Sequence, residues 1–237
     1  MTRKRPLIIA IDGTSGVGKS TVARRLAQEL EVPFLETGAM YRALGLKVAE
    51  LALDPADQES VERLAAELDL ELRHRADGGV DVLLDGMSLG ERARRPRISE
   101  VTSAISTYPG VRRIMVQHQR SFAEELGAVV EGRDIGTKVF PDTPFKFFLQ
   151  APLETRVQRR LKQLEASGES DLSQEELARE VAERDHRDST RAESPLTVNS
   201  SYRVVDTGSL SVEQVVQAIL SEIDQLSSAD SPPTSQS

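Results

Sequence analysis

A glycine-rich loop directly follows a short apolar run near the start of the chain. Residues 7–11 (LIIAI) have the composition of a buried parallel strand. Residues 13–20 (GTSGVGKS) match the pattern G-x-x-x-x-G-K-[ST], and a helical period begins where they end, over residues 20–30. A strand, a loop and a helix in this order predict a P-loop, whose backbone N–H groups bind the phosphates of a nucleoside triphosphate.

Each residue type in the loop has a physical reason. Glycine lets the backbone turn its N–H groups inward, where a Cβ atom would obstruct them. The positive end of the following helix dipole points at the same phosphates. We expect Lys19 to reach the β- and γ-phosphates and the Ser20 hydroxyl to contact Mg²⁺. The loop alone leaves open whether the γ-phosphoryl group goes to water, to a protein or to a small molecule.

The rest of the chain alternates between strand-like and helix-like segments. The expected strands cover residues 7–11, 32–35, 128–130, 145–149 and 202–205. The expected helices cover residues 20–30, 38–51, 109–125, 153–166, 174–191 and 212–226. Because parallel strands need crossover connections, this alternation predicts an α/β fold, a three-layer α/β/α arrangement around a five-stranded parallel sheet.

One stretch departs from this alternation. Residues 70–75 alternate apolar and polar side chains, residues 76–79 (ADGG) favour a turn, and residues 80–84 are mostly apolar. Asp85 and Gly86 then offer a second turn. We expect a small antiparallel hairpin or three-stranded meander here, inserted into the α/β frame.

The length of 237 residues and the apolar content fit one domain, which we expect to cover residues 1–226. Residues 227–237 (SSADSPPTSQS) contain a single apolar alanine besides two prolines. A segment of this composition does not bury enough apolar surface to fold, so we expect a disordered tail.

Composition excludes several kinds of site and partner. The chain has no cysteine, which removes disulfides, zinc–thiolate sites, iron–sulfur clusters and a cysteine nucleophile. Its three histidines are far apart in sequence and predict no metal site. A net charge of −8 argues against binding along a nucleic-acid backbone. No stretch has the length of a signal peptide or a membrane span, so we expect a cytoplasmic protein without nucleic-acid or membrane partners.

Arginine recurs in stretches that a parallel sheet would place near its ligand-binding edge. Residues 36–42 (ETGAMYR) follow the second expected strand, and residues 131–137 (EGRDIGT) follow the third. Two further groups have the spacing of one helix face: Arg184, Arg187, Asp188 and Arg191, and Arg156, Arg159 and Arg160. Arginine grips phosphate bidentately, which favours a site for a phosphorylated acceptor. The alternative is an ordinary helix start and solvated ion pairs, since acidic residues lie among the basic ones.

Five segments occur in the order that one known family shows. They are residues 11–21 (IDGTSGVGKST), 37–42 (TGAMYR), 103–112 (SAISTYPGVR), 131–149 (EGRDIGTKVFPDTPFKFFL) and 184–196 (RDHRDSTRAESPL). Together they resemble the bacterial cytidylate (CMP) kinases, nucleoside monophosphate kinases of the P-loop class, over about residues 7–226. Of the five segments, only the P-loop is specific when it is taken without the others. The resemblance implies an insert at about residues 37–110 that binds the nucleoside monophosphate, and a helical lid at about residues 153–192.

The resemblance implies transfer of the γ-phosphoryl group of ATP to CMP or dCMP, giving CDP or dCDP and ADP with the help of Mg²⁺. It places ATP in the P-loop, with three lid arginines closing over the phosphates. The residues expected to bind ATP are Gly13, Thr14, Ser15, Gly16, Val17, Gly18, Lys19, Ser20, Thr21, Arg156, Arg159 and Arg160.

The resemblance also assigns the acceptor pocket. The implied groups are Arg42, Arg133 and Arg191 on the α-phosphate of CMP; Ser103, Arg112 and Asp134 on the edge of the cytosine; Arg184 and Asp188 near the ribose hydroxyls; and Thr37 and Tyr41 along the pocket. A carboxylate accepts from the exocyclic N4 amine, and an arginine or hydroxyl donates to N3 and O2. The residues expected to take part in catalysis are Lys19, Arg133, Asp134, Arg184, Asp188 and Arg191.

The chain departs from the family pattern at three positions. Glu131 stands where the resemblance leads us to expect aspartate, which extends the reach of this carboxylate toward Mg²⁺ or water by one methylene. Ser20 stands where glycine is more usual and adds a hydroxyl. Thr37 stands for a serine, a mild change.

Two alternatives remain at this stage. In the first, the phosphoryl acceptor is UMP, dTMP or a small metabolite such as shikimate. An ionised Asp134 facing the base would disfavour UMP, because the uracil O4 accepts hydrogen bonds and donates none. In the second, the chain is an ATP-binding module that regulates a protein partner, for which the sequence offers no exposed apolar helix face. We expect a monomer that binds small-molecule substrates.

Overall fold

The computed structural model describes residues 6–75, 77–167, 173–190 and 194–229, which are built around a parallel sheet. The five strands lie in the order β2-β6-β1-β7-β8; they are β1 (Ile8–Gly13), β2 (Phe34–Glu36), β6 (Ala128–Gly132), β7 (Lys146–Gln150) and β8 (Arg203–Asp206). All neighbouring pairs are parallel. Each strand overlaps a segment expected from the sequence, so the predicted α/β fold is confirmed.

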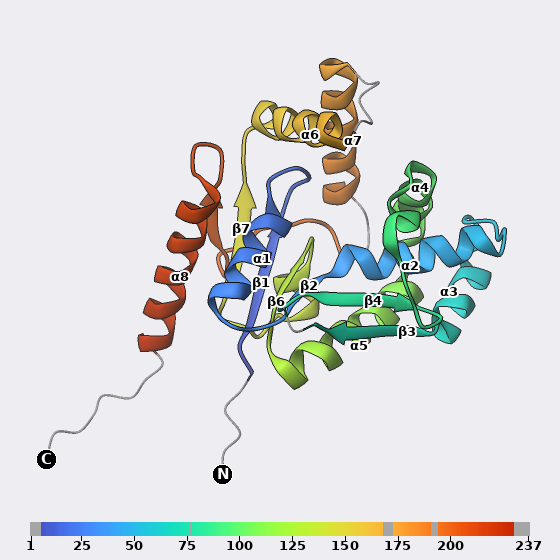
Figure 1. The fold of residues 1–237 in the computed structure, drawn as a ribbon, viewed down its shortest axis with the longest axis horizontal. Helices are drawn as coiled ribbons and strands as arrows, with labels where there is room; N and C mark the ends of the chain where they lie inside the picture. Colours follow the sequence, from blue (N-terminus) through green and yellow to red (C-terminus); the bar gives the residue numbers. More distant parts are fainter. Residues whose placement is uncertain (1–5, 76, 168–172, 191–193, 230–237) are drawn as a thin grey trace, which may run out of the picture.

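Helices cover both faces of the sheet (Figure 1). Successive side chains of β1 point to opposite faces, so this strand packs against both layers. The covering helices are α1 (Lys19–Glu29) and α8 (Val212–Ala229) on one face, and α2 (Thr37–Glu50) and α5 (Pro109–Leu126) on the other. Ile9 and Ile11 are buried in the first core, and Ala10 is buried in the second. The central strand therefore contributes to both cores.

The chain between β2 and β6 (residues 37–127) includes the insert expected at about residues 37–110, and it contains the predicted small sheet. Its elements are α2, α3 (Gln58–Glu67), β3 (Leu70–His74), β4 (Val80–Leu84), β5 (Met87–Ser88), the 3-10 helix η1 (Gly90–Arg94), α4 (Pro96–Ile105) and α5. Strands β3, β4 and β5 form an antiparallel meander. The turn between β3 and β4 contacts the main sheet, since the N–H of Phe34 donates to the Gly78 carbonyl over 3.0 Å.

Helices α3 and α4 lie outside the segments expected to be helical. Each has ten residues, and helices this short depend on packing against neighbours for their stability. Here α3 packs on α5, and α4 packs on α2. The start of α3 does carry a local signal, because the Asp57 side chain accepts from the N–H of Ser60 over 3.2 Å.

Helices α6 (Leu153–Ser167) and α7 (Gln174–Thr190) project beyond the carboxyl ends of the strands (Figure 1). They pack together through a small cluster, separate from the two main cores, of Val157, Leu164, Leu177 and Val181. The expected helix over residues 174–191 is thus present to Thr190, and Arg191 lies outside the described residues.

The final helix, α8, continues to Ala229, into the segment expected to be a tail. Residues 230–237 lie outside the described part of the chain. Among the described helices, none is both long enough and apolar enough to cross a membrane.

A buried carboxylate at the end of β1 joins three segments of the chain. Asp12 has no exposed surface. Its oxygens accept from the N–H groups of Ile135 and Gly136, both over 2.9 Å, and from the Tyr202 hydroxyl over 2.6 Å. Burial raises the pKa of Asp12, and these donors act against that shift. Asp12 thereby holds the π-helix η2 (Ile135–Val139) and the chain before β8 against the sheet.

Tyr202→Phe tests the contribution of this carboxylate. The phenyl ring keeps its edge-on packing against Phe148, where the ring centroids lie 6.1 Å apart, but Asp12 loses a buried donor. We expect the free energy of unfolding to fall by about 1.5–3 kcal/mol, as for hydrogen bonds to charged groups, measured by urea denaturation. Tyr108→Phe is the matched control, because that hydroxyl donates to the neutral Pro55 carbonyl over 2.8 Å. Equal losses in the two variants would contradict the role of Asp12.

Candidate functional site

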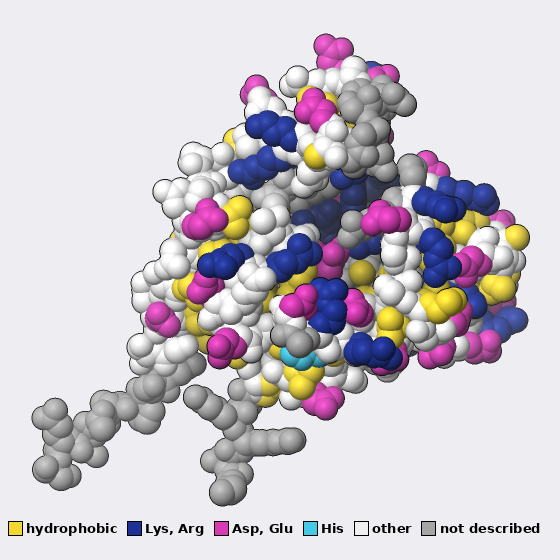
Figure 2. Space-filling view, in the orientation of Figure 1, with side chains coloured by type: hydrophobic (Ala, Val, Ile, Leu, Met, Phe, Trp, Pro, Cys, Tyr) yellow, Lys and Arg dark blue, Asp and Glu magenta, His cyan; other side chains and the backbone are white. Residues whose placement is uncertain are grey.

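The candidate site lies at the carboxyl edge of the sheet. The loops after β1, β2 and β6 meet there, and α6 and α7 stand above them (Figure 1). Figure 2 shows a hollow between these two helices and the insert, in which Lys and Arg side chains gather. Ligands of open parallel sheets bind in this position.

The P-loop has the backbone that its glycines predict. Gly16 and Gly18 adopt φ values of 73° and 94°, in the left-handed region that favours glycine. A Cβ atom on Gly13 would lie 2.2 Å from the Leu149 carbonyl oxygen. Gly18 caps α1 and supplies no side chain to its first N–H groups. The first N–H groups of α1 thus receive no side-chain cap from Gly18, which suits the binding of an anion there.

Lys19 and Ser20 follow the last glycine of the loop and begin α1. The Lys19 ammonium donates to the Thr14 carbonyl over 2.8 Å. Burial, with repulsion from the Arg133 guanidinium, lowers the pKa of Lys19 to about 7. Thr21, in contrast, is exposed on α1. Since a bound phosphate would favour the charged ammonium, Lys19 suits an anionic ligand.

Ser20 and Glu131 form a pair whose chemistry fits Mg²⁺. The Ser20 hydroxyl donates to Glu131 Oε1 over 2.9 Å. The other carboxylate oxygen, Oε2, is buried and has no hydrogen-bond partner within the described ranges. Burial raises the pKa of Glu131, while the nearby Lys19 lowers it. Mg²⁺ binds through one or two oxygen ligands plus substrate phosphates, so a hydroxyl beside an unpartnered carboxylate oxygen suits a phosphate-bound ion.

Two of the three arginines expected to close over ATP contact the P-loop backbone. Arg156 donates to the Ser15 carbonyl over 2.9 Å, and Arg159 donates to the Val17 carbonyl over 3.3 Å. Asp185 of α7 forms an ion pair with Arg156 and accepts from the Ser15 N–H over 3.0 Å. These contacts attach α6 and α7 to the loop. Arg160 is exposed on α6.

The arginines expected at the acceptor phosphate come from different elements. Arg133 follows β6, donates to the Gly13 carbonyl and forms an ion pair with Asp188 of α7 over 2.9 Å. Arg42 of α2 pairs with Glu36. Arg184 is exposed at the surface of α7, and partial loss of hydration together with repulsion from Arg133 lowers its pKa; its other charged neighbours include Arg42, Arg160 and Asp188. The structure thus brings these cations together; Arg191 lies outside the described residues.

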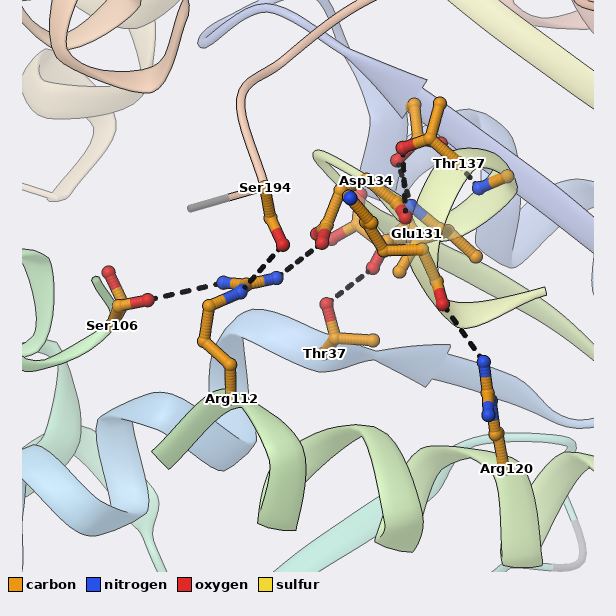
Figure 3. A network of polar contacts seen from close by, with 12 residues as sticks. Thr37, Ser106, Arg112, Arg120, Glu131, Asp134, Thr137 and Ser194 are labelled. Atoms are coloured by element: carbon orange, nitrogen blue, oxygen red, sulfur yellow. Dashed lines mark hydrogen bonds and ion pairs between the residues drawn. The ribbon is translucent and has the colours of Figure 1, made fainter. Parts of the chain in front are cut away.

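Two of the three residues expected to read a base, Arg112 and Asp134, lie in a buried network (Figure 3). Arg112 and Asp134 are 6% and 5% exposed and form an ion pair. The Arg112 guanidinium also donates to the Ser106 carbonyl over 3.2 Å and lies 5.7 Å from the centre of the Tyr41 ring. Ser103 lies one turn before Ser106, at the end of α4, and its carbonyl accepts from the Ser106 hydroxyl over 3.1 Å.

Thr37 joins the two loops on this side of the sheet. It begins α2, is 5% exposed, and its hydroxyl donates to the Glu131 carbonyl over 2.8 Å (Figure 3). Both Thr37 and Tyr41 are buried on the first turns of α2. The hydroxyl of Thr37 is therefore used to position the end of β6.

Three functional candidates were not among the expected site residues: Asp12, Asp185 and Ser194. All three lie inside segments that carry the resemblance, Asp12 in residues 11–21 and Asp185 and Ser194 in residues 184–196, but no role was assigned to them there. Ser194 accepts from Arg112 Nε over 2.9 Å. Only the tertiary fold brings each of these side chains to its partner.

Comparison with known proteins agrees with this arrangement. The model of the cytidylate kinase family matches residues 9–225. The cytidylate kinase of Pelotomaculum thermopropionicum is 43% identical over 215 residues, covering 91% of this chain and 95% of the relative. That of Syntrophotalea carbinolica is 44% identical over 217 residues, covering 91% of each chain.

Among solved structures, an uncharacterized protein from Eubacterium ventriosum shares the fold, with a TM-score of 0.53 at 15% identity over 93% of this chain and 99% of that one. The fold follows from this likeness, and the family follows from the sequence matches over almost the whole length. The chain belongs to the cytidylate kinase family.

Proposed function

We propose that this chain transfers the γ-phosphoryl group of ATP to CMP and dCMP. The observation that carries the proposal is the buried Arg112–Asp134 pair, which lies beside a P-loop and a cluster of arginines. A P-loop accounts for the donor, and the arginines suit an acceptor that already carries a phosphate. The paired carboxylate and guanidinium suit the amine and ring acceptors of cytosine. The relatives named cytidylate kinases support the same substrate.

Phosphoryl transfer needs positioning and charge stabilisation more than covalent chemistry. Lys19 and the loop N–H groups would hold the β- and γ-phosphates. Arg133 lies between the P-loop and Asp188, where it would contact both the transferred group and the acceptor phosphate. Mg²⁺, held by Ser20, Glu131 and the phosphates, would neutralise charge on the donor. Arg42, Arg184 and Arg191 would hold the acceptor in line.

Offering single acceptors with Mg-ATP tests this function. ADP release is expected with CMP and dCMP, and at more than about 100-fold lower kcat/KM with UMP, because a buried carboxylate repels the uracil O4. The set includes dTMP, AMP and shikimate as further acceptors. In Asp134→Asn, the neutral amide should reduce the ratio of kcat/KM for CMP to kcat/KM for UMP. Equal turnover of CMP and UMP by the natural chain would contradict the role of Asp134.

Arg133→Ala tests the bridging arginine. The loss of its charged hydrogen bonds should cost about 1.5–3 kcal/mol of transition-state stabilisation, seen as a fall in kcat/KM for CMP. Arg63→Ala is the control, because the ion pair of Arg63 with Glu59 is exposed on α3. Normal turnover of CMP by Arg133→Ala would show that Arg133 does not hold the transferred or the acceptor phosphate.

We also propose that the insert binds the nucleoside monophosphate and that α6 and α7 form a lid. The separate cluster between these helices supports a unit that moves as one body, and closure would exclude water that competes with the acceptor.

Hydrogen exchange in α6 and α7 should slow when ATP and CMP are both bound. Asp185→Asn, which loses the ion pair with Arg156, should exchange faster without ligands; Glu183→Gln, exposed on α7, is the control. Equal protection with and without both nucleotides would refute a lid.

The finer assignments rest on the family. We propose a magnesium-dependent, monomeric enzyme of pyrimidine nucleotide metabolism in the cytoplasm. Its substrates are small molecules, and its large net negative charge supports the expectation that nucleic acid is not a partner.

A further inference from the structure

Ser194 combines burial with an unusual backbone. Ser194 is 7% exposed. Its φ of 51° lies in the left-handed region that residues other than glycine rarely adopt. Such a conformation costs free energy and persists where the surrounding structure fixes it. Residues of this kind cluster at functional sites.

The chain around Ser194 is fixed from two sides. The N–H of Leu196 donates to the Asp188 carbonyl over 2.7 Å, which ties this segment to the end of α7. The side chain of Leu196 packs with Phe148 and Tyr202 beside the sheet. The position of Ser194 therefore depends on both α7 and the sheet.

The hydroxyl of Ser194 contacts the proposed base-reading pair. It accepts from Arg112 Nε over 2.9 Å (Figure 3). The two other nitrogens of the same guanidinium donate to the Ser106 carbonyl, at the end of α4, and to Asp134, after β6. Three segments far apart in the sequence thus fix the plane of one guanidinium, and Ser194 supplies the contact from the α7 side.

We propose that Ser194 is a positioning residue for pyrimidine recognition, acting through the orientation of Arg112. The proposal rests on the proposed function of Arg112 and Asp134. Without the hydroxyl, a buried N–H of Arg112 loses its acceptor, and the guanidinium turns to find another. Arg112 and Asp134 then no longer face the base in the arrangement that distinguishes the amino group of cytosine from the carbonyl oxygen of uracil.

Two variants separate the hydroxyl from the backbone. Ser194→Ala removes the acceptor and keeps a Cβ atom at a positive φ, whereas Ser194→Gly removes the acceptor and relieves the backbone. In both, CMP binding measured by calorimetry should weaken about tenfold, and the ratio of kcat/KM between CMP and UMP should fall by about tenfold, in line with the loss of a hydrogen bond to a charged group. The KM for ATP should stay unchanged. Ser189→Ala is the control, because its exposed hydroxyl donates to the His186 carbonyl over 3.0 Å, within α7.

A double-mutant cycle distinguishes positioning from general stability. Arg112→Lys lacks the Nε–H that Ser194 accepts, so Ser194→Ala should change the CMP to UMP ratio no further in that background. Additive effects, or a Ser194→Ala variant with the natural ratio, would overturn the proposal. If Ser194→Ala alone lost selectivity and Ser194→Gly kept it, the backbone and not the hydroxyl would be responsible, and the proposal would again fail. A natural chain that does not prefer CMP would refute the proposed function instead.

Discussion

The buried carboxylate of Asp12 fixes the part of the molecule on which the candidate site depends. It lies at the end of the central strand and binds the first two N–H groups of η2 together with the Tyr202 hydroxyl. Arg133 and Asp134 immediately precede η2, so their backbone is held by the same interaction. A buried charged group needs several donors to be tolerated. Two of these donors, the N–H groups of Ile135 and Gly136, come from the segment that directly follows Arg133 and Asp134 of the candidate site.

Electrostatics explain why the site would prefer two anionic ligands. The chain as a whole carries a net charge of −8, yet the hollow at the sheet edge gathers Lys19, Arg133 and Arg184. Mutual repulsion contributes to the lowered pKa values of Lys19 and Arg184. Phosphate groups bound among these cations would relieve that repulsion. Net charge is therefore a poor guide to a local site.

The sequence was most informative where a local pattern determines the structure. The apolar run before Asp12 and the glycines that follow it specify a strand and a P-loop without help from the rest of the chain. The turn at Gly78 and Gly79 likewise predicted the small sheet. The ten-residue helices α3 and α4 were missed, because their stability comes from packing on α5 and α2.

Residue types predicted which side chains lie close together. They predicted less well which group each side chain contacts. The spacing of Arg156 and Arg159 indicated one helix face, but not that their guanidinium groups donate to P-loop carbonyls. Ser194 lies in the segment 184–196 that carries the resemblance, but its contact with Arg112 was not predicted, because the two residues are distant in sequence. Contacts of this kind depend on the tertiary fold, and periodicity does not report them.

The contact between Phe34 and the hairpin turn has a consequence for association between molecules. Strand β2 lies at one edge of the main sheet, and an edge strand offers unpaired backbone groups to any other strand that approaches. The N–H of Phe34 is occupied by the Gly78 carbonyl, and Phe34 also forms a bridge with Gly79. The hairpin thus shields this edge from pairing with a second chain. At the opposite edge, β8 carries the ion pair of Arg203 with Glu222, and charged side chains of this kind are a common protection against strand-to-strand aggregation.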